Sequence, residues 1–566
     1  MAQIESLSGK TLTPPRNVRF QRQWGRLMKA ILDIAAPQDA EETLATPRGM
    51  KLLCLLPRIY MAEDLWPGEQ EHLERLDKEF NRPPPKSGKN KNAIYNRLCV
   101  DRVRSQAACW DTIRRAIPTL RERIDKDQAE ACEDQAEETA RPGAAKKTTT
   151  ATQAEEVEAQ TAREEAAAEE HTRKIERATR LINRAEFGRA RNLLDPNSKS
   201  LAVANQQTLE QLREMNPAPI SEEHLSREQR ESGIPDLREG AQAGSADPPL
   251  TPLDKEEVWK ALMTTRRLTA AGRSGWTREL VEPLAVVDGA KESFSRVIGK
   301  IATGAIPHKL RPFLYGGRIV PLDKGDGRVR PIVVGDFLVK VAGKALLGRE
   351  TSRLLTKFEA EDQFGVSVQG GMERITHTIQ TLLELDKMTS PSDQQKQRVG
   401  PRGVLQLDFA NAYNTISRKL IRTALLRDTA FAGLLTYFDA HYPTVEAVNC
   451  PKLAVRMEDG STAWIASQEG VHQGDPLGPI FFSFGLSEVM LEARTLMGEN
   501  RWKQAFTAAY LDDIHSVSDV RRLEAVMHAV RVAARRTNSG LILSAPKCKL
   551  FVPEGLEQGL FEEVFG

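Results

Sequence analysis

The stretch GVLQLDFANAYNTISRKLI occupies residues 403–421, and its VLQLDF portion is rich in apolar, strand-compatible residues. We predict a short strand that ends at Asp408, followed by a helix that begins near Asn414 or Thr415. An acid at the end of a core strand projects toward the edge of a cleft. By itself such an aspartate is also typical of a helix N-cap, so its meaning depends on the rest of the chain.

A second acidic stretch, FTAAYLDDIHSVSD, occupies residues 506–519. Two strand-compatible runs flank Asp512 and Asp513, which predicts a hairpin with both acids at its tip. Two such charges about 4 Å apart repel by roughly 4 kcal/mol at an effective dielectric constant near 20. A divalent cation removes this cost, and hard oxygen ligands suit Mg²⁺. Without further context, an Asp-Asp pair is a common surface turn.

Composition bounds the class of protein but does not identify it. The 566 residues suggest roughly three or four domains, with 40% hydrophobic, 6% aromatic and 28% charged residues. The 80 Lys and Arg residues nearly balance the 78 acidic ones, so the net charge of +2 does not argue for nucleic acid. The charge is nevertheless uneven, because residues 309–357 are basic.

The six cysteines lack the paired spacings of a zinc module or of a disulfide framework, so we expect free thiols in a reducing compartment. The amino-terminal residues lack an apolar signal core, and no window approaches 18 continuous apolar residues. We therefore expect an intracellular protein without a membrane span. These arguments do not separate nucleus from cytoplasm.

Periodicity and composition divide the chain into an amino-terminal part, a linker and a longer carboxyl-terminal part. Residues 1–126 show helical spacing of apolar side chains, whereas residues 127–172 are charged, low in complexity and poor in large apolar residues. We expect that second region to be a disordered or solvated-helix linker. Ordered patterns resume in residues 173–252, and Asp254 is a plausible N-cap for the next helix.

The residues around the acids resemble one enzyme family. YLDD at 510–513 is similar to the Y-x-D-D box of reverse transcriptases, and LDFANAYNTI at 407–416 resembles the first palm motif of that family. Between them, EGVHQGDPLGPIFFSFGL at 469–486 resembles the Q-G-x-x-x-G-P motif. The three motifs stand in the order that the family has.

Further motifs extend the resemblance to residues 253–551. Residues 316–346 and 363–380 resemble two fingers motifs, and SAPKCKLF at 544–551 resembles the lysine-bearing motif that closes the palm. Residues 182–217 and 270–280 resemble the corresponding regions of LINE-type (non-LTR) retrotransposon proteins.

The resemblance implies an α+β fold of the right-hand polymerase type. Fingers would occupy residues 253–400, and a palm with an antiparallel sheet and helices would occupy residues 401–566, after an extension at 173–252. The family normally continues with a primer-grip turn and a helical thumb. The match ends at Phe551, so we expect a domain truncated after the palm, with thumb and endonuclease both absent from the sequence.

The resemblance also implies a two-metal site for nucleotidyl transfer. Its metal ligands would be Asp408, Phe409, Asp512 and Asp513, holding two Mg²⁺ ions with Mn²⁺ as an alternative. The three aspartates would be catalytic together with Lys547, which would protonate or stabilise the pyrophosphate leaving group. A plain surface lysine is the alternative at that position.

Three residues would contact the nucleotide or the nascent base pair. Tyr413 lies five residues after Asp408, where an aromatic ring leaves no room for a 2′-hydroxyl and so favours dNTP over NTP. A core tyrosine is the alternative. Gln473 and Gly474 would pack on the nascent base pair and template, and we predict that a helix begins after them near Pro476 or Leu477. The phenylalanines that follow are expected in the core.

Two basic side chains of the segment PLDKGDGRVRPI, residues 321–332, would contact the triphosphate. Arg330 would act as a bidentate fork and Lys324 as a point charge. Gly325 and Gly327 allow the tight turn that this arrangement needs. An exposed basic turn is the alternative, and the neighbouring arginines at 318 and 328 could serve the same need as Lys324.

The leading functional hypothesis is an RNA-directed DNA polymerase that extends a primer 3′-hydroxyl with dNTP. Its partners would be an RNA template, a DNA or RNA primer, and a second protein supplying a thumb or endonuclease. One alternative is a truncated or domesticated retroelement protein that binds RNA without polymerising. The other is an RNA-directed RNA polymerase, which Tyr413 disfavours.

Overall fold

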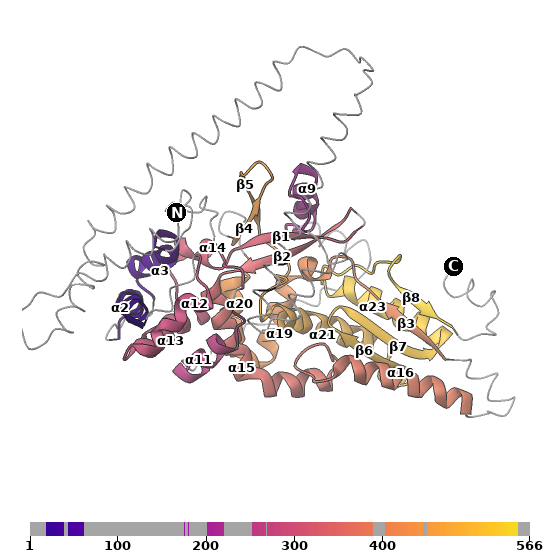
Figure 1. The fold of residues 1–566 in the computed structure, drawn as a ribbon. Helices are drawn as coiled ribbons and strands as arrows, with labels where there is room; N and C mark the ends of the chain where they lie inside the picture. Colours follow the sequence, from indigo (N-terminus) through magenta and orange to yellow (C-terminus); the bar gives the residue numbers. More distant parts are fainter. Residues whose placement is uncertain are drawn as a thin grey trace, which may run out of the picture. The chain divides into compact units, whose positions relative to one another are not determined.

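The computed structural model describes residues 18–38, 44–60, 175, 179, 201–219, 252–267, 269–325, 327–388, 402–444 and 450–552. The chain forms two compact units. The first comprises residues 1–111, 203–320 and 331–566, and the second comprises residues 112–202 and 321–330. Helices and sheets are mixed (Figure 1), in agreement with the predicted α+β class.

Two amino-terminal helices belong to the first unit. α2 (Val18–Ala35) packs against α3 (Pro47–Tyr60) and against α13 (Ala290–Ala302). The indole of Trp24 donates to the Leu280 carbonyl at 2.8 Å, and the indole of Trp276 donates to the Leu53 carbonyl at 2.8 Å. These buried bonds link segments more than 200 residues apart, so residues 18–60 pack as part of this unit and not as a separate domain.

The same helical part contains α11 (Lys255–Thr264), α12 (Arg278–Val281), α14 (Arg311–Leu314) and the long α15 (Phe337–Ala360). Short 3₁₀ turns, η3 (Glu282–Val286) and η4 (His308–Leu310), connect these helices. Asp254 caps α11 in a capping box with Glu257, which confirms the predicted N-cap. α11 and α13 both pack on α15 and bury a continuous apolar core.

The first sheet has the strand order β2-β1-β4-β5. Its strands are β1 (Gly317–Asp323), β2 (Val329–Gly335), β4 (Lys452–Arg456) and β5 (Thr462–Ala466). β1 runs parallel to β4, with Gly317 opposite Leu453, and β4 pairs with β5 in an antiparallel hairpin. β1, which precedes the predicted palm, thus shares a sheet with β4, which lies inside it. No local sequence pattern predicts this pairing.

The second sheet has the order β6-β7-β3-β8, and its three strand pairs are antiparallel. Its strands are β3 (Arg402–Leu407), β6 (Phe506–Tyr510), β7 (Asp513–Asp519) and β8 (Lys549–Phe551). α23 (Val520–Arg536) packs on β3 and β7 and against α21 (Gly478–Met497) (Figure 1). α16 (Gly371–Met388) also contacts this sheet.

Short helices connect the strands of the second sheet to the rest of the unit. They are α18 (Ala412–Thr415), α19 (Arg418–Arg427), η5 (Thr429–Phe431), α20 (Ala432–His441) and α22 (Glu499–Trp502), with α9 (Gln206–Glu214) ahead of the helical part. The helix predicted near Asn414 begins at Ala412, because Asn411 takes a left-handed conformation (φ 51°) that turns the chain earlier. The predicted phenylalanine core is confirmed: Phe481, Phe482 and Phe484 are buried.

The described part of the second unit is small. Leu201 forms an antiparallel bridge to Leu322, and the amide of Ala202 donates to the Pro321 carbonyl at 3.0 Å. Gly325 and Gly327 have φ angles of 83° and 76°, which confirms the predicted tight glycine turn. Lys324 and Arg330 are exposed at this turn. Of the predicted extension at 173–252, the structure describes only residues 175, 179, 201–219 and 252, and the predicted linker at 127–172 lies wholly outside the described residues.

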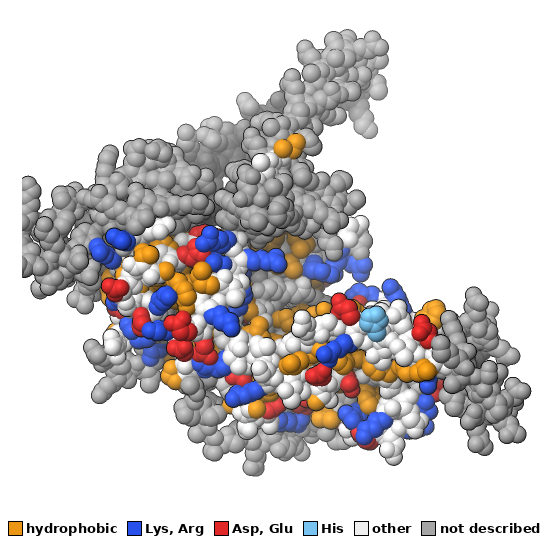
Figure 2. Space-filling model, turned by 60° about the horizontal axis from the view of Figure 1, so that its bottom comes forward, with side chains coloured by type: hydrophobic (Ala, Val, Ile, Leu, Met, Phe, Trp, Pro, Cys, Tyr) orange, Lys and Arg blue, Asp and Glu red, His pale blue; other side chains and the backbone are white. Residues whose placement is uncertain are grey.

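Two surface properties bear on function. Among the described residues, no helix is both long and apolar enough to cross a membrane. With the bottom of Figure 1 turned forward, acidic and basic side chains are interspersed over the described part of that face, without a continuous basic stripe (Figure 2). This face therefore does not show the single-sign surface that is typical of phosphate binding.

Candidate active site

The register of the second sheet brings the three predicted aspartates to one end of it. The pairing of β3 with β7 ends with Leu407 opposite Ile514, so Asp408 and Asp513 each lie one residue from this last pair, at the same end of the sheet. Asp512 precedes Asp513 in the turn, and thus joins the pair from the adjacent hairpin.

The hairpin itself is tight. Tyr510 pairs with Asp513 as the last rung of β6 and β7, which leaves Leu511 and Asp512 as a two-residue link. Leu511 has φ 55°, and Asp512 does not share that positive φ. A positive φ at only the first linking residue is the pattern of a type II′ turn, where glycine is favoured. A bulky leucine there costs about 1–2 kcal/mol, so other contacts must hold the turn.

The charges of the three aspartates influence one another. Burial raises the pKa of Asp512, and the carboxylates of Asp513 and Asp408 raise it further, while Lys547 lowers it. The ammonium of Lys547 forms an ion pair with Asp408 Oδ1 at 2.9 Å, and the two side chains are 40% and 25% exposed. A cation is thus already drawn to this group of acids.

Lys547 reaches Asp408 because a backbone turn places it there. The amide of Ser544 donates to the Asp408 carbonyl at 2.8 Å, and the amides of Lys547 and Cys548 donate back to the Ser544 carbonyl. The turn leads directly into β8, which pairs with β3. The lysine-bearing motif predicted from the sequence therefore lies beside the first aspartate, 139 residues away along the chain.

The chemistry of these donors suits a hard divalent cation, since carboxylate oxygens that repel one another are stabilised by one. Among the described residues, however, no three His, Cys, Asp or Glu side chains close around a single point. Phe409 could contribute only its carbonyl, because its side chain is apolar and 1% exposed. The strand-like bonds beside it use the Asp408 carbonyl and the Ala410 amide, which leaves the Phe409 carbonyl outside that pairing.

Tyr413 lies in α18, next to this group. Its ring stacks on Phe482, with centroids 4.7 Å apart and planes 8° from parallel. Burial raises its pKa, and the charge of Asp512 raises it further, so the phenol lies within electrostatic reach of that acid. Its carbonyl accepts from the amide of Val471 at 2.7 Å. The ring is thus held by Phe482, and the backbone of Tyr413 is held by Val471.

An upstream segment also holds the loop that carries Tyr413. The side-chain amide of Asn411 donates to the Met215 carbonyl at 2.9 Å, and Asn414 Nδ2 donates to Asn216 Oδ1 at 3.3 Å. These contacts come from residues just after α9, in the predicted extension. Sequence reasoning missed them, because an asparagine near the end of a helix ordinarily predicts only a cap.

Gln473 and Gly474 lie against β2. The Gln473 carbonyl accepts from the Val333 amide at 2.9 Å, and Gly474 has φ 126°. A Cβ at Gly474 would come within 2.4 Å of the Val333 carbonyl oxygen, so glycine is required by this backbone contact itself. The helix predicted to start near Pro476 or Leu477 starts at Gly478, where Pro479 provides the proline of the first turn.

A buried polar network supports this loop, and the sequence did not reveal it. Asp475 accepts from the hydroxyls of Tyr442 at 2.7 Å and Tyr437 at 3.3 Å, and burial raises its pKa to about 6. His441 bonds to the Tyr437 hydroxyl at 3.0 Å, and burial lowers its pKa to about 3. The Ser467 hydroxyl bonds to the ring of His472 at 2.7 Å.

Arg418 anchors the same loop from the first turn of α19. It is fully buried, and its guanidinium donates to the carbonyls of Gly470, Ser467, Pro443 and Glu469 and to the Ser467 hydroxyl. A run such as SRKLI predicts an exposed arginine at a helix start. Only the path of the distant loop makes this one internal.

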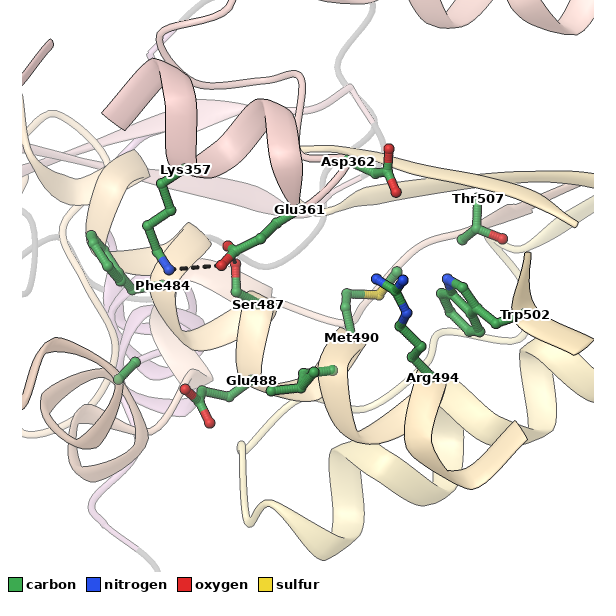
Figure 3. A pocket seen from close by; sticks show the side chains of 12 residues that line it. Lys357, Glu361, Asp362, Phe484, Ser487, Glu488, Met490, Arg494, Trp502 and Thr507 are labelled. Atoms are coloured by element: carbon green, nitrogen blue, oxygen red, sulfur yellow. Dashed lines mark hydrogen bonds and ion pairs between the residues drawn. The ribbon is translucent and has the colours of Figure 1, made fainter. Parts of the chain in front are cut away.

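The structure also contains a pocket away from these residues. It is lined by side chains of α15, α21, α22 and β6, among them Lys357, Glu361, Phe484 and Trp502 (Figure 3). The Lys357 ammonium is 2.7 Å from Glu361, which also accepts from the Ser487 hydroxyl at 2.7 Å. Within the described chain, no predicted site residue lines this pocket. Two more of its charged side chains, Glu488 and Arg494, form ion pairs with residues outside the lining, Arg427 and Glu499.

Comparison with known proteins supports the assignment. Residues 322–558 match the family described as "Reverse transcriptase (RNA-dependent DNA polymerase)". The chain is 28% identical over 312 residues to the retrotransposable element SLACS 132 kDa protein of Trypanosoma brucei gambiense, covering 54% of this chain and 23% of that protein. It is 30% identical over 170 residues to the retrovirus-related Pol polyprotein from type-1 retrotransposable element R2 of Popillia japonica, covering 30% and 21%.

The chain therefore spans less than a quarter of the length of these two relatives. Among solved structures, it is similar to apo telomerase from Candida tropicalis truncated from its C-terminal domain, at 12% identity and a TM-score of 0.30, covering 44% of this chain and 52% of that one. Telomerase from Candida albicans with a fragment of telomeric RNA gives a TM-score of 0.32 at 12% identity, covering 44% and 45%.

The sequence match and the two curated relatives agree with the motifs gathered at one end of the second sheet. This chain carries a reverse transcriptase domain related to those of non-LTR retrotransposon proteins.

Proposed function

We propose that this chain catalyses RNA-directed DNA synthesis, adding dNTP to a primer 3′-hydroxyl on an RNA template. The observation that carries the proposal is the strand register that brings Asp408 and Asp513 to the same end of the paired strands β3 and β7, with Asp512 in the adjoining turn. On this proposal the second sheet with its helices is the palm, and the helical part with the β1–β2 turn forms the fingers.

Reverse transcriptase domains use divalent metal ions, and the acids described above would hold them. Asp408, Asp512, Asp513 and the Phe409 carbonyl would bind two Mg²⁺ ions, with Mn²⁺ as an alternative. The ions would neutralise charge that develops on the attacking and leaving oxygens of phosphoryl transfer. Burial and, after it, repulsion from Asp513 and Asp408 raise the pKa of Asp512, and this supports the role because a bound cation removes that repulsion.

Lys547 would serve the leaving group. Its ammonium now pairs with Asp408, and both side chains are partly exposed, so the amine can exchange that partner for a phosphate oxygen. A lysine that carries its proton beside the reacting phosphate can donate it to pyrophosphate as the bond breaks. Its place in the turn ahead of β8 keeps it next to the acids throughout.

Other residues would bind and select the nucleotide. Tyr413, held flat against Phe482, would exclude a 2′-hydroxyl, and Gln473 with Gly474 would pack on the nascent base pair. Lys324 and Arg330 would contact the triphosphate from the glycine turn. The RNA template and a DNA or RNA primer would be the macromolecular partners, and a further protein could supply thumb or endonuclease functions.

The test is primer extension on poly(rA)/oligo(dT) with Mg²⁺ or Mn²⁺, comparing dTTP with UTP. We expect incorporation of dTTP, its loss in Asp512→Asn, and full retention in Asp459→Asn, which removes a charge from the exposed β4–β5 turn. Preferred use of UTP would indicate an RNA polymerase instead. RNA binding without synthesis under either metal would favour a non-polymerising RNA-binding protein.

A further inference from the structure

Gln363 lies where a distant segment meets the catalytic turn. Its side-chain carbonyl accepts from the Leu511 amide at 2.9 Å, and its side-chain amide donates to the Leu511 carbonyl at 3.1 Å. The two residues are 148 positions apart, and Gln363 is only 3% exposed. One carboxamide thus satisfies both backbone groups of the residue that immediately precedes Asp512.

The residue that Gln363 holds is the one least suited to its conformation. Leu511 has φ 55°, where a residue other than glycine is uncommon. A leucine released from these two bonds would move its backbone toward φ values that it prefers. Because Asp512 and Asp513 follow at once, that movement would displace the carboxylates from Asp408.

The backbone around Gln363 is built to keep the carboxamide in place. The Phe364 amide donates to the Ala509 carbonyl at 2.8 Å, and the Ala509 amide donates to the Asp362 carbonyl at 2.8 Å, so this segment extends the second sheet beyond β6. A Cβ on Gly365 would come within 2.4 Å of the Leu511 nitrogen. Only a glycine at 365 allows the segment to approach the turn this closely.

We infer that Gln363 is a positioning residue for the catalytic turn, holding Leu511 in the left-handed conformation that aims Asp512 and Asp513 at Asp408. The inference rests on the proposed polymerase function, which assigns those acids their role. The carboxamide bonds to the backbone of Leu511 and to the amide of Gly365. It acts through the backbone of Leu511.

Gln363→Met tests this role, because methionine has a similar length but can form neither bond. We expect kcat for dTTP incorporation to fall about 10- to 100-fold, the scale of a 1 Å misplacement of reacting groups, with KM for dTTP changed less than about threefold. Gln369→Met is the matched control: the same substitution on an exposed glutamine six residues along the chain, which should leave kcat unchanged.

Leu511→Gly gives a suppressor, since glycine adopts a positive φ without assistance. In the Gln363→Met background, Leu511→Gly should restore part of the lost kcat, by at least about threefold. A residue that only supported folding would show no such rescue. A double variant no more active than Gln363→Met would overturn the inference.

Hydrogen exchange provides a readout that does not need activity. Peptides that contain the Leu511 amide should lose protection in Gln363→Met and keep it in Gln369→Met. Unchanged exchange at Leu511, or unchanged kcat in an active Gln363→Met protein, contradicts the role of Gln363. Parent protein that fails to extend any primer, but shows the expected exchange difference, contradicts the polymerase proposal instead.

Discussion

Two arginines of α19, four residues apart, allow a sharp test of how the loop ahead of Gln473 is stabilised. Arg418 is fully buried and donates to four backbone carbonyls and one hydroxyl, at distances from 2.7 to 3.3 Å. Arg422 also makes several bonds, but to one partner, Asp439, and both side chains are 40% exposed. We predict that Arg418→Met destabilises the protein far more than Arg422→Met.

The magnitude follows from what each substitution leaves behind. Arg418→Met leaves buried acceptors without a hydrogen-bond donor, and each acceptor that finds no new partner costs about 1–3 kcal/mol. Removal of one partner from a buried charged network typically costs about 3–5 kcal/mol in total, after relaxation. Arg422→Met removes an exposed ion pair that contributes about 0.2–1 kcal/mol. The two losses should therefore differ by about 3 kcal/mol or more.

Urea unfolding followed by circular dichroism at pH 7 measures the free energy of unfolding of both variants and of the parent. Matching denaturant slopes would show that the variants expose the same surface. Equal losses for the two arginines, or a loss below about 1 kcal/mol for Arg418→Met, would refute the claim that this guanidinium anchors the loop.

Further predictions concern the acids, the tyrosine and the buried histidine. Asp512→Asn should lower primer extension at least about 10²–10³-fold without lowering the free energy of unfolding, because it removes a repelling charge. Tyr413→Ala should raise the use of NTP more than it changes the use of dNTP, measured as the ratio of the two kcat/KM values. Lys547→Met should lower the rate about 10²–10⁴-fold and shift melting little, since the ion pair is exposed. Burial lowers the pKa of His441 from 6.5 to about 3, so neutral His441 contributes fully to the free energy of unfolding only above pH 6.5. As the pH falls, the free energy of unfolding should decrease, by about 2 kcal/mol at pH 5. His441→Gln should show a smaller loss between pH 7 and pH 5 in urea unfolding, even though Asp475 titrates with the opposite sign in both proteins.

Local sequence was sufficient for several elements of the site. The apolar run before Asp408 predicted β3, and the two β-compatible runs around YLDD predicted the β6–β7 hairpin with its acids at the turn. Asp254 as an N-cap and the glycine turn at 325–327 were likewise predictable, because caps and tight turns depend on residues within a few positions of one another. The predicted starts of the helices that follow Asp408 and Gly474 differ from the observed starts by about two residues. In each case the backbone conformation of a single residue sets the helix boundary.

Other features had no local signature. From the sequence, Gln363 in QFGVS is an ordinary polar residue, and Arg418 is expected to be exposed. In the fold, each contacts a backbone segment many positions away. Asn216 and the buried partners of Asp475 are of the same kind. Hydrogen bonds between distant segments produce no periodicity and no fixed spacing in the sequence, so they cannot be predicted from neighbouring residues along the chain.

The sequence alone predicted the chemistry of this protein, from three acids, a lysine and a tyrosine in family order and from the strands that present them. The tertiary structure decided how they are held. Pairing of β3 with β7 brings Asp408 and Asp513 to the same end of the sheet, and Gln363 keeps Leu511 in a conformation that leucine alone would not favour. The division has a physical cause. Side-chain chemistry and local backbone preference depend on adjacent residues, whereas the positions of the site residues relative to one another depend on contacts between segments that only folding brings together.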